Sequence, residues 1–282
     1  MNKFEAKNRL FLIDALALIY HAYRNSSERN NSTISGFFAM LERILLTYKP
    51  THIAVAFDIK KPTFRHKLDN KYKANRKKMP VEIQNSLPII KNLLVLLNIQ
   101  SIELEGYEAD DIIGTLAKKA SSENYKVYIV SPDKDFFQLI NENTSICKLN
   151  KPGKEVKIIG LAEVRNRFTI ANTSQIPEIM ALCGDKSDNI LGIPGLGSRN
   201  ARKLISQFGT IDEIYNKLET LNAKQKELFF KFRAQVELSK KLVTIDTKIP
   251  LSISLESLKI KNYSKNEIFE ILDVFNQHQK FD

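Results

Sequence analysis

The chain has 282 residues, 43% of them hydrophobic, and its 43 Lys and Arg against 32 Asp and Glu give a formal net charge of +11. This length suits one large domain or two small ones, and the basic balance favours a polyanionic partner such as nucleic acid. Two separate cysteines, Cys147 and Cys183, and the lack of a long apolar run exclude disulfide-rich, zinc-finger and membrane-spanning classes, so we expect a cytoplasmic protein.

Three hydrophobic runs in the first half of the chain lead directly into acidic side chains. The runs are residues 9–14, 51–58 and 126–131, and the acids are Asp14, Asp58, Asp133 and Asp135. Short apolar runs of this kind are typical of buried parallel strands. Because sites in parallel sheets lie outside the carboxyl ends of the strands, we expect these acids to meet at one edge of the sheet.

Helical periodicity fills the intervals between these strands. The pattern predicts helices over residues 15–23, 35–48 and 81–97, a strand over residues 99–104, and an edge hairpin from residues 144–149 and 155–159 around Pro152 and Gly153. Strands that alternate with helices indicate an α/β domain with a parallel sheet. From about residue 161 the pattern is helical, and we place the domain boundary between residues 1–175 and 176–282.

A basic segment follows the second predicted strand. Residues 60–78 hold nine Lys and Arg against one acid, Asp69, with Phe64 and Tyr72 interleaved. Bases and rings in alternation are expected where a protein grips a phosphate backbone and stacks on exposed bases, so we predict DNA contacts for Arg65 and Tyr72. The alternative is a solvated basic loop.

Three acids begin the helix predicted within residues 106–120. Glu108, Asp110 and Asp111 fall on its first turn, where the helix dipole favours negative charge. Carboxylates this close also repel one another and would gain from a shared cation. By itself the run is compatible both with an ordinary acidic helix start and with a metal site.

The helical half opens with two more acids and a glycine turn. Asp185 and Asp188 follow a helix predicted from residue 176, and a basic helix comes after the turn. Glycines allow a tight turn that presents free N–H groups to a phosphate. We predict a helix-hairpin-helix whose DNA contacts are Gly195, Gly197, Arg199, Arg202 and Lys203. Further helices are predicted over residues 211–218 and 223–245, without a site.

Nine acids, with no histidine or cysteine, make up the candidate metal site. They are Asp14, Asp58, Glu108, Asp110, Asp111, Asp133, Asp135, Asp185 and Asp188. Carboxylate oxygens select Mg²⁺ or Mn²⁺ over zinc or copper. In a basic protein such a set suits two divalent ions that act on a phosphodiester, and Lys73 and Arg76 would add catalytic positive charge.

Seven motifs, in this order, resemble those of the 5′ nuclease family. They are Ile13-Asp14, Phe57-Asp58, Phe64-Arg65-His66, Tyr72-Lys73, Gly106-Tyr-Glu-Ala-Asp-Asp111, Asp133-Lys-Asp135 and Gly184-Asp-Lys-Ser-Asp-Asn189. The chain is most similar to the 5′-3′ exonuclease domain of bacterial DNA polymerase I, a relative of the flap endonucleases. The resemblance implies a PIN-like α/β fold with a parallel sheet flanked by helices, a helical arch at about residues 59–80, and a C-terminal helix-hairpin-helix subdomain.

The resemblance also implies an activity and a division of the acids. It implies a monomeric, Mg²⁺-dependent 5′-3′ exonuclease and 5′-flap endonuclease of replication and repair, acting on DNA with 5′ flaps, nicks or ends and on RNA-DNA primers, with Mn²⁺ as a substitute. One ion would lie on Asp14, Asp58, Glu108 and Asp110, with Asp111 nearby, and the other on Asp133, Asp135 and Asp188, with Asp185 as a ligand or one step outside. Tyr20 matches an aromatic position that stacks on a base, with core packing as the alternative.

Two positions depart from the family pattern. Ala15 stands where glycine is common, and Ser198-Arg199-Asn200 replaces a Lys-Thr pair, which weakens the K⁺ site that the family pattern implies at the hairpin. Two other functions are open: a non-catalytic binder of DNA junctions and a PIN-type ribonuclease. The retained acids argue against the first, because carboxylates repel phosphate, and the turn at Gly195 argues against the second.

Overall fold

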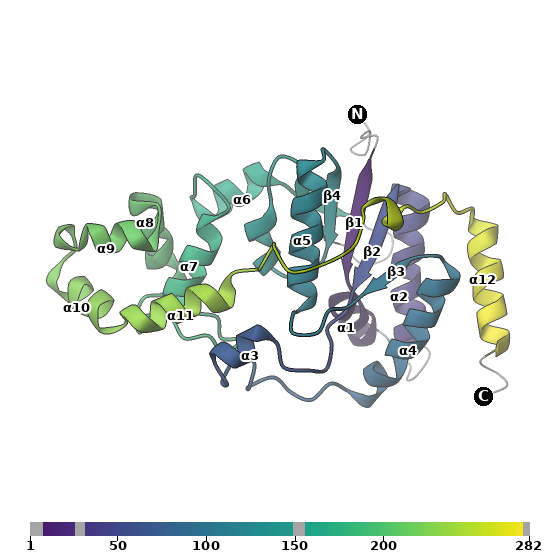
Figure 1. Cartoon of the computed structure of the whole chain (residues 1–282), viewed down its shortest axis with the longest axis horizontal. Coiled ribbons are helices and arrows are strands. Elements are labelled where there is room, and N and C mark those ends of the chain that lie inside the picture. Colours follow the sequence, from purple (N-terminus) through teal and green to yellow (C-terminus); the bar gives the residue numbers. More distant parts are fainter. Residues whose placement is uncertain (1–7, 26–31, 149–155, 279–282) are drawn as a thin grey trace.

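A six-stranded sheet forms the centre of one half of the molecule (Figure 1). The computed structural model describes residues 8–25, 32–148 and 156–278. The strands are β1 (Arg9–Asp14), β2 (His52–Ala56), β3 (Gln100–Ile102), β4 (Lys126–Val130), β5 (Thr144–Lys148) and β6 (Lys157–Ile159), in the order β3-β2-β1-β4-β5-β6. All neighbours are parallel except β5 and β6, so the predicted parallel sheet and edge hairpin are confirmed. The turn predicted at Pro152 and Gly153 lies outside the described residues.

The residues of β1 alternate between the two faces of the sheet. Leu10 and Leu12 join the core on the face covered by α5 (Ala109–Ser122). Phe11 and Ile13 join the core on the opposite face, with α1 (Ala15–Asn25), α2 (Ser32–Arg43) and α4 (Val81–Leu96). A strand that is buried on both faces is hydrophobic throughout, which is why residues 10–13 form an unbroken apolar run.

The predicted helices of this half are present, with one change at an end. The helix predicted over residues 35–48 is regular to Arg43 and continues as a π-helix, η1 (Ile44–Tyr48). It ends at Lys49, which has a left-handed backbone with φ 44°. The next residue, Pro50, cannot continue a helix.

The order of the strands defines where a site can form. The chain moves outward from β1 through β2 to β3, and α5 then carries it back to β4 on the other side of β1. The strand order therefore reverses between β1 and β4. At such a reversal the connections diverge and leave a crevice at the carboxyl ends of the strands.

The basic segment, predicted to form a helical arch, consists mostly of turns and irregular chain. It contains one short helix, α3 (Phe64–Leu68), which is followed by turns over residues 70–75 and by extended chain as far as Pro80. Figure 1 shows this segment running below α5 and α11 before it enters α4. The segment lies at the same end of the molecule as the start of α5.

The second half of the molecule is helical, as predicted. It comprises α6 (Leu161–Phe168), α7 (Gln175–Cys183), α8 (Ser198–Phe208), α9 (Ile211–Asn216), α10 (Ala223–Lys231) and α11 (Arg233–Val243), with a short 3₁₀ turn at η3 (Leu218–Thr220). Two further 3₁₀ turns lie outside this half: η2 (Asp135–Leu139), between β4 and β5, and η4 (Glu256–Leu258), after α11. The single helix predicted over residues 223–245 is two helices that meet at Phe232. Apolar side chains of α7 to α11 belong to the same core as α5.

After α11 the chain returns across α5 to the sheet (Figure 1). Ile245 and Ile249 are buried in the α5 core, and Lys259 forms an isolated bridge with His52 of β2. The Tyr263 hydroxyl then donates to the Leu97 carbonyl at 2.6 Å, ahead of α12 (Lys265–His278). Residues beyond 244 therefore pack on the α/β half, although the predicted division placed them in the second domain. The division into residues 1–175 and 176–282 stays a prediction.

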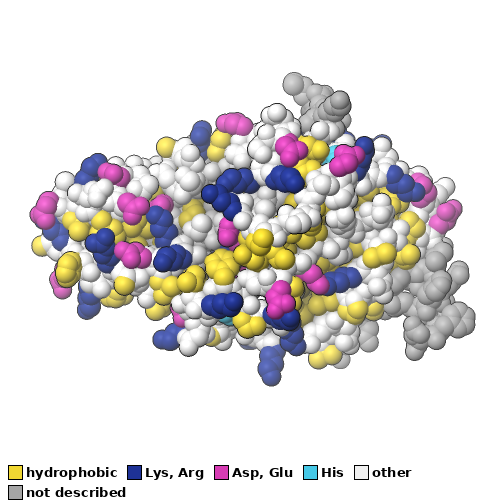
Figure 2. Space-filling view, in the orientation of Figure 1, with side chains coloured by type: hydrophobic (Ala, Val, Ile, Leu, Met, Phe, Trp, Pro, Cys, Tyr) yellow, Lys and Arg dark blue, Asp and Glu magenta, His cyan; other side chains and the backbone are white. Residues whose placement is uncertain are grey.

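No helix in the described part of the chain is long and apolar enough to cross a membrane. Lys and Arg side chains are spread over both halves of the face in Figure 2, with Asp and Glu interspersed among them. On this face the excess of positive charge is therefore not gathered into a single patch.

Candidate active site

Asp14 and the acids after β4 are linked at the carboxyl ends of β1 and β4. Asp14, the last residue of β1, is 8% exposed. Its Oδ1 accepts a hydrogen bond from the Ala17 N–H at 3.1 Å, and its Oδ2 accepts one from the Ser131 hydroxyl at 2.9 Å. The Ser131 oxygen in turn accepts the Asp133 N–H at 3.1 Å. Asp14 and Asp133 are thus joined through one serine.

The start of α5 brings the next acids to the same place. The Ala109 N–H donates to Asp58 Oδ1 at 2.9 Å, which ties the residues after β2 to the first turn of α5. Glu108 and Asp110 flank Ala109, and the charges of Asp14 and Asp58 act on Asp110. The structure therefore gathers Asp14, Asp58, Glu108 and Asp110, hereafter the strand-end group.

A second set of acids comes from two connections rather than from strand ends. The Asp135 N–H donates to Asp133 Oδ1 at 2.9 Å, and the Lys134 ammonium lies 3.1 Å from Asp185 Oδ2. Backbone hydrogen bonds between Asp185 and Ile190 close the loop that also carries Asp188. We call Asp133, Asp135, Asp185 and Asp188 the loop group.

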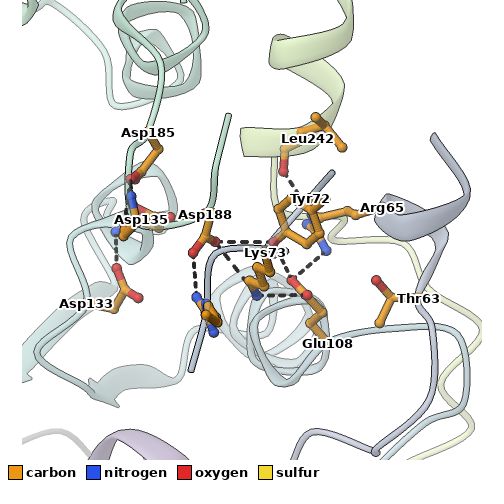
Figure 3. A network of polar contacts seen from close by, with 12 residues as sticks. Thr63, Arg65, Tyr72, Lys73, Glu108, Asp133, Asp135, Asp185, Asp188 and Leu242 are labelled. Carbon is orange, nitrogen blue, oxygen red and sulfur yellow. Dashed lines mark hydrogen bonds and ion pairs between the residues drawn. The ribbon is translucent and has the colours of Figure 1, made fainter. Parts of the chain in front are cut away.

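Lys73 spans the two groups (Figure 3). Its ammonium lies 2.8 Å from Glu108 Oε1 and 3.7 Å from Asp188 Oδ2, and Asp188 also pairs with Arg76 through its Oδ1. The backbone holds Lys73 in place, because its N–H donates to the Asp188 carbonyl at 2.9 Å and its φ is 55°. The two predicted catalytic cations therefore lie directly on the predicted metal-binding acids.

The pKa of Asp14 is raised to about 6. The main cause is burial, followed by the charges of the neighbouring Asp58 and Asp133 carboxylates, whereas hydrogen bonds from Ala17 and Ser131 act to lower the pKa. This shift means that Asp14, which is buried, is crowded by negative charge. A carboxylate in such surroundings is stabilised by a proton or by a cation.

Two further acids have raised pKa values for the same reasons. Burial, then Asp14 and other acids nearby, raise the pKa of Asp110 well above its ordinary value. Burial, then Asp133 and Asp185, raise the pKa of Asp135 to about 8. Asp185 differs: burial acts to raise its pKa, but hydrogen bonds from Ser187 and the Lys134 charge lower it overall.

The donors fit a hard divalent cation. Every acid in the two groups offers oxygen, and Asp135 Oδ1 is buried without a hydrogen-bond partner. A buried carboxylate oxygen needs such a partner or a cation. Among the described residues, no group of three or more His, Cys, Asp or Glu side chains is arranged so that it could hold a metal ion. In this arrangement the acids are instead paired with Lys73, Arg76 and Lys134.

Three predicted site residues lie in the interior. Arg65, Tyr72 and Asp111 are 2%, 3% and 0% exposed. The Tyr72 hydroxyl donates to Glu108 at 3.0 Å and to Asp188 at 3.3 Å, and Arg65 pairs with Asp111 and Glu108. The predicted DNA contacts of Arg65 and Tyr72 disagree with these positions, because buried side chains that are already bonded cannot reach a strand outside.

The predicted hairpin connects α7 and α8 as expected. Gly195 has φ +79°, a left-handed conformation that favours glycine, and a Cβ there or at Gly197 would meet no atom within 4 Å. A hollow of about 560 Å³ lies beside α8, lined by Thr169, Arg199, Arg202, Lys203, Ser206 and Gln207. The three predicted basic contacts of α8 thus share one concave surface.

Tyr20 takes a position between its two predicted roles. Its ring is partly buried against the core that contains Phe11, and the Arg24 guanidinium lies 5.8 Å from the ring centre. Base stacking by Tyr20 stays a prediction.

The 5′-3′ exonuclease family matches both halves of the chain. The model of its N-terminal resolvase-like domain matches residues 9–169, and that of its C-terminal SAM fold matches residues 171–266. The chain belongs to the 5′-3′ exonuclease family. The predicted resemblance and fold class are thereby confirmed.

Curated relatives of this 5′-3′ exonuclease family member are longer proteins. DNA polymerase I of Bacillus subtilis (strain 168) is 35% identical over 272 residues, which cover 94% of this chain and 31% of the polymerase. DNA polymerase I of Lactococcus lactis is 36% identical over an alignment of 290 positions, which covers 95% of this chain and 32% of the polymerase. The chain therefore spans about a third of the length of these relatives.

Solved structures share the fold. A T5 5′-exonuclease with bound zinc has a TM-score of 0.74 at 18% identity, over 96% of this chain and 99% of that one. The bacteriophage T5 D15 flap endonuclease, in a pseudo-enzyme-product complex with DNA and metal ions, has a TM-score of 0.73 at 19% identity, over 96% and 100%. The catalytic core of Rad2 with a DNA substrate has a TM-score of 0.62 at 19% identity, over 96% and 88%.

Two residues of this site were not predicted from the sequence. Ser131 joins Asp14 to Asp133, and Lys134 binds Asp185. Both lie in the motif that links β4 to Asp135, and a serine at the end of a buried strand was a usable signal. Lys134 had no such signal, because its partner lies 51 positions further along the sequence.

Proposed function

We propose that this chain is a structure-specific 5′ nuclease that hydrolyses DNA phosphodiesters as a 5′-3′ exonuclease and a 5′-flap endonuclease. The observation that carries the proposal is the meeting of two acid groups under Lys73, which lies 2.8 Å from Glu108 and 3.7 Å from Asp188. Acids alone would repel a phosphate, and bases alone would only bind it. Side by side, they suit a reaction in which a metal-bound phosphate is attacked by water.

The two groups divide the metal-binding work. We assign the strand-end group to one divalent ion and the loop group to another, with Mg²⁺ preferred and Mn²⁺ as a substitute, since all donors are oxygens. When bound, such ions lower the pKa of water and neutralise the charge of the reacting phosphate. Asp111 is left out of this assignment, because its oxygens are already bonded to Arg65 and to backbone N–H groups.

Lys73 and Arg76 are assigned to the reacting phosphate. Both lie on acids that would bind the ions, so they would be free to contact a phosphate at the same place once the acids hold divalent metal. Their charge is then available where the transition state is most anionic. Tyr72 supports these acids from the interior of the protein, because its hydroxyl hydrogen-bonds to Glu108 and Asp188.

The duplex part of the substrate is assigned to the hairpin. Gly195, Gly197 and the N-terminus of α8 offer N–H groups to a phosphate, and Arg199, Arg202 and Lys203 line the hollow beside them. The T5 and Rad2 structures that share this fold are complexes with DNA, which supports DNA as the class of substrate. A K⁺ ion at the hairpin, RNA-DNA primers as substrates, a monomeric state and a cytoplasmic location stay predictions.

Product mapping on a labelled substrate tests the proposal. The purified chain is incubated with a 5′-flap duplex, with and without Mg²⁺, beside nicked DNA, a blunt duplex and single-stranded RNA of equal length. We expect metal-dependent cutting near the junction of the flap and the duplex. Binding without cutting would favour a junction binder, and preference for single-stranded RNA would favour a ribonuclease.

A further inference from the structure

The guanidinium of Arg65 is saturated with hydrogen bonds inside the protein. Its Nε donates to the Leu242 carbonyl at 2.9 Å, and its Nη1 donates to Asp111 at 2.7 Å and Glu108 at 3.2 Å. Its Nη2 donates to Asp111 at 2.8 Å and to the Thr244 carbonyl at 2.9 Å. An arginine has five N–H donors, so all of them are used.

Asp111 is saturated in the same way. Its Oδ1 accepts from Arg65 and from the Asp246 N–H at 2.9 Å, and its Oδ2 accepts from Arg65 and from the Glu108 N–H at 3.1 Å. A carboxylate has about four lone-pair positions, and none is left for a metal ion. The carboxylate that begins α5 beside the metal-binding acids therefore has a different partner.

We propose that Arg65 and Asp111 are a positioning pair, which sets the orientation of Glu108 for divalent-ion binding and connects it to the chain that follows α11. The inference rests on the proposed function, since it assigns Glu108 to a metal. Neither Arg65 nor Asp111 touches substrate. Arg65 holds the Glu108 carboxylate, and Asp111 holds the Glu108 backbone.

The pair joins three elements that are distant in sequence. Arg65 comes from α3, Asp111 from α5, and the two carbonyls from the end of α11 and the residue after it, at separations of 46 to 179 positions. Since α3 begins the segment that carries Lys73, the pair also fixes where that segment starts. Loss of the Asp111 charge would leave a buried cation partly unpaired and the Glu108 N–H without an acceptor.

Lysine cannot replace Arg65 in this geometry. An ammonium has three donors around one point and cannot make the paired contact to Asp111 while also reaching both carbonyls. Arg65→Lys therefore keeps the charge and removes the fork, whereas Asp111→Asn keeps the shape and removes the charge. The two variants disturb the pair from opposite sides.

Metal-induced thermal stabilisation is the primary measurement. Melting temperature is followed against Mn²⁺ and Mg²⁺ concentration, without DNA, for the unaltered chain and both variants. We expect the metal concentration for half-maximal stabilisation to rise about 10- to 100-fold, the loss usual when a residue that supports a metal ligand is changed. With flap DNA, kcat should fall while KM and metal-free binding change little.

Glu178→Gln is the matched control. Glu178 is 7% exposed, pairs with Lys240 of α11 at 2.9 Å and accepts the Ile211 N–H at 3.1 Å. It is also a buried acid that ties α11 to another helix, but it belongs to neither acid group. We expect this variant to lower the melting temperature and to leave the metal midpoint unchanged.

Equal losses of melting temperature in the three variants, with unchanged metal midpoints, would overturn the proposal and leave the pair a purely structural one. If both pair variants fail to fold, Arg65→Met combined with Asp111→Leu replaces the buried ions by apolar side chains, an exchange that proteins often tolerate. The proposal then requires the metal shift in that double variant. Because this measurement needs no DNA, failure of the unaltered chain to cut a flap would count against the proposed function alone.

Discussion

The strand-end group and the loop group are held in place by different means. Asp14 belongs to a buried strand, Asp58 accepts the Ala109 N–H at the start of α5, and the Glu108 N–H donates to Asp111. Asp185 and Asp188 lie in a connection, where Ser187 and Lys134 hold the Asp185 carboxylate and Lys73 and Arg76 pair with Asp188. The comparison teaches that the sheet sets the first group rigidly, whereas the second depends on loops and on charges that substrate or metal can displace.

Removing an acid of the strand-end group should have the largest effect. Asp110→Ala deletes a carboxylate at the centre of that group, and we expect flap cleavage to fall by about 1,000-fold or more. Binding to flap DNA in EDTA should stay largely intact, as measured by fluorescence anisotropy. Joint loss of binding and cleavage would point to a folding role.

Lys73→Ala, which removes the contact between the two acid groups, should have the second-largest effect. We expect single-turnover cleavage to slow by about 100-fold, with a much smaller change in affinity, because the ammonium acts on charge that develops during reaction. Lys71→Ala, in the same turn and with an exposed side chain, is the matched control. Unaltered turnover in the Lys73 variant would refute its placement over the site.

Within the loop group we expect a smaller loss. Asp135→Asn keeps the shape of the side chain but removes its charge, and cleavage at saturating Mg²⁺ should fall by about 10-fold. The loss should be larger at low Mg²⁺, because the affinity of one ion is reduced. A loss as large as that of Asp110→Ala would show that the two groups are equally rigid.

The smallest expected effect is on the pH dependence of stability, which should distinguish the two acid groups. The folded chain holds protons on Asp14 and Asp135 up to a pH of about 6 and about 8, above the ordinary range of an aspartate. Folded protein therefore binds more protons than unfolded protein, and stability falls as pH rises through these values. In EDTA, the melting temperature should drop between pH 4 and about 8, and Asp135→Asn should flatten the upper part of this drop. An unchanged curve would contradict the crowding of charge around Asp135.

The acids could be predicted because their positions follow from local rules. Each run that ends on Asp14 or Asp58 is a strand, and parallel strands end at one edge. The burial of Arg65 could not be predicted in the same way. A base within a basic segment reads as exposed, and its acceptors at Leu242 and Thr244 come from a part of the chain that packing alone brings near.

The path of the chain after α11 was missed for a similar reason. With the rest of residues 176–282, residues 246–260 were assigned to the helical half, because the pattern after residue 161 is helical. Their apolar side chains, such as Ile249 and Leu258, are buried against the core of α5 instead. They pack against a surface made by other elements, which a local pattern does not reveal.

The return of this chain segment to β2 has a mechanical consequence. Helices α7 to α11 are joined to the α/β half twice, once before α7 and once after α11, and Lys259 anchors the second connection at His52. Because these helices also share one buried core with α5, packing sets the span between the glycine turn and the acids. On the proposed function, we therefore expect a set number of nucleotides between the held duplex and the severed bond.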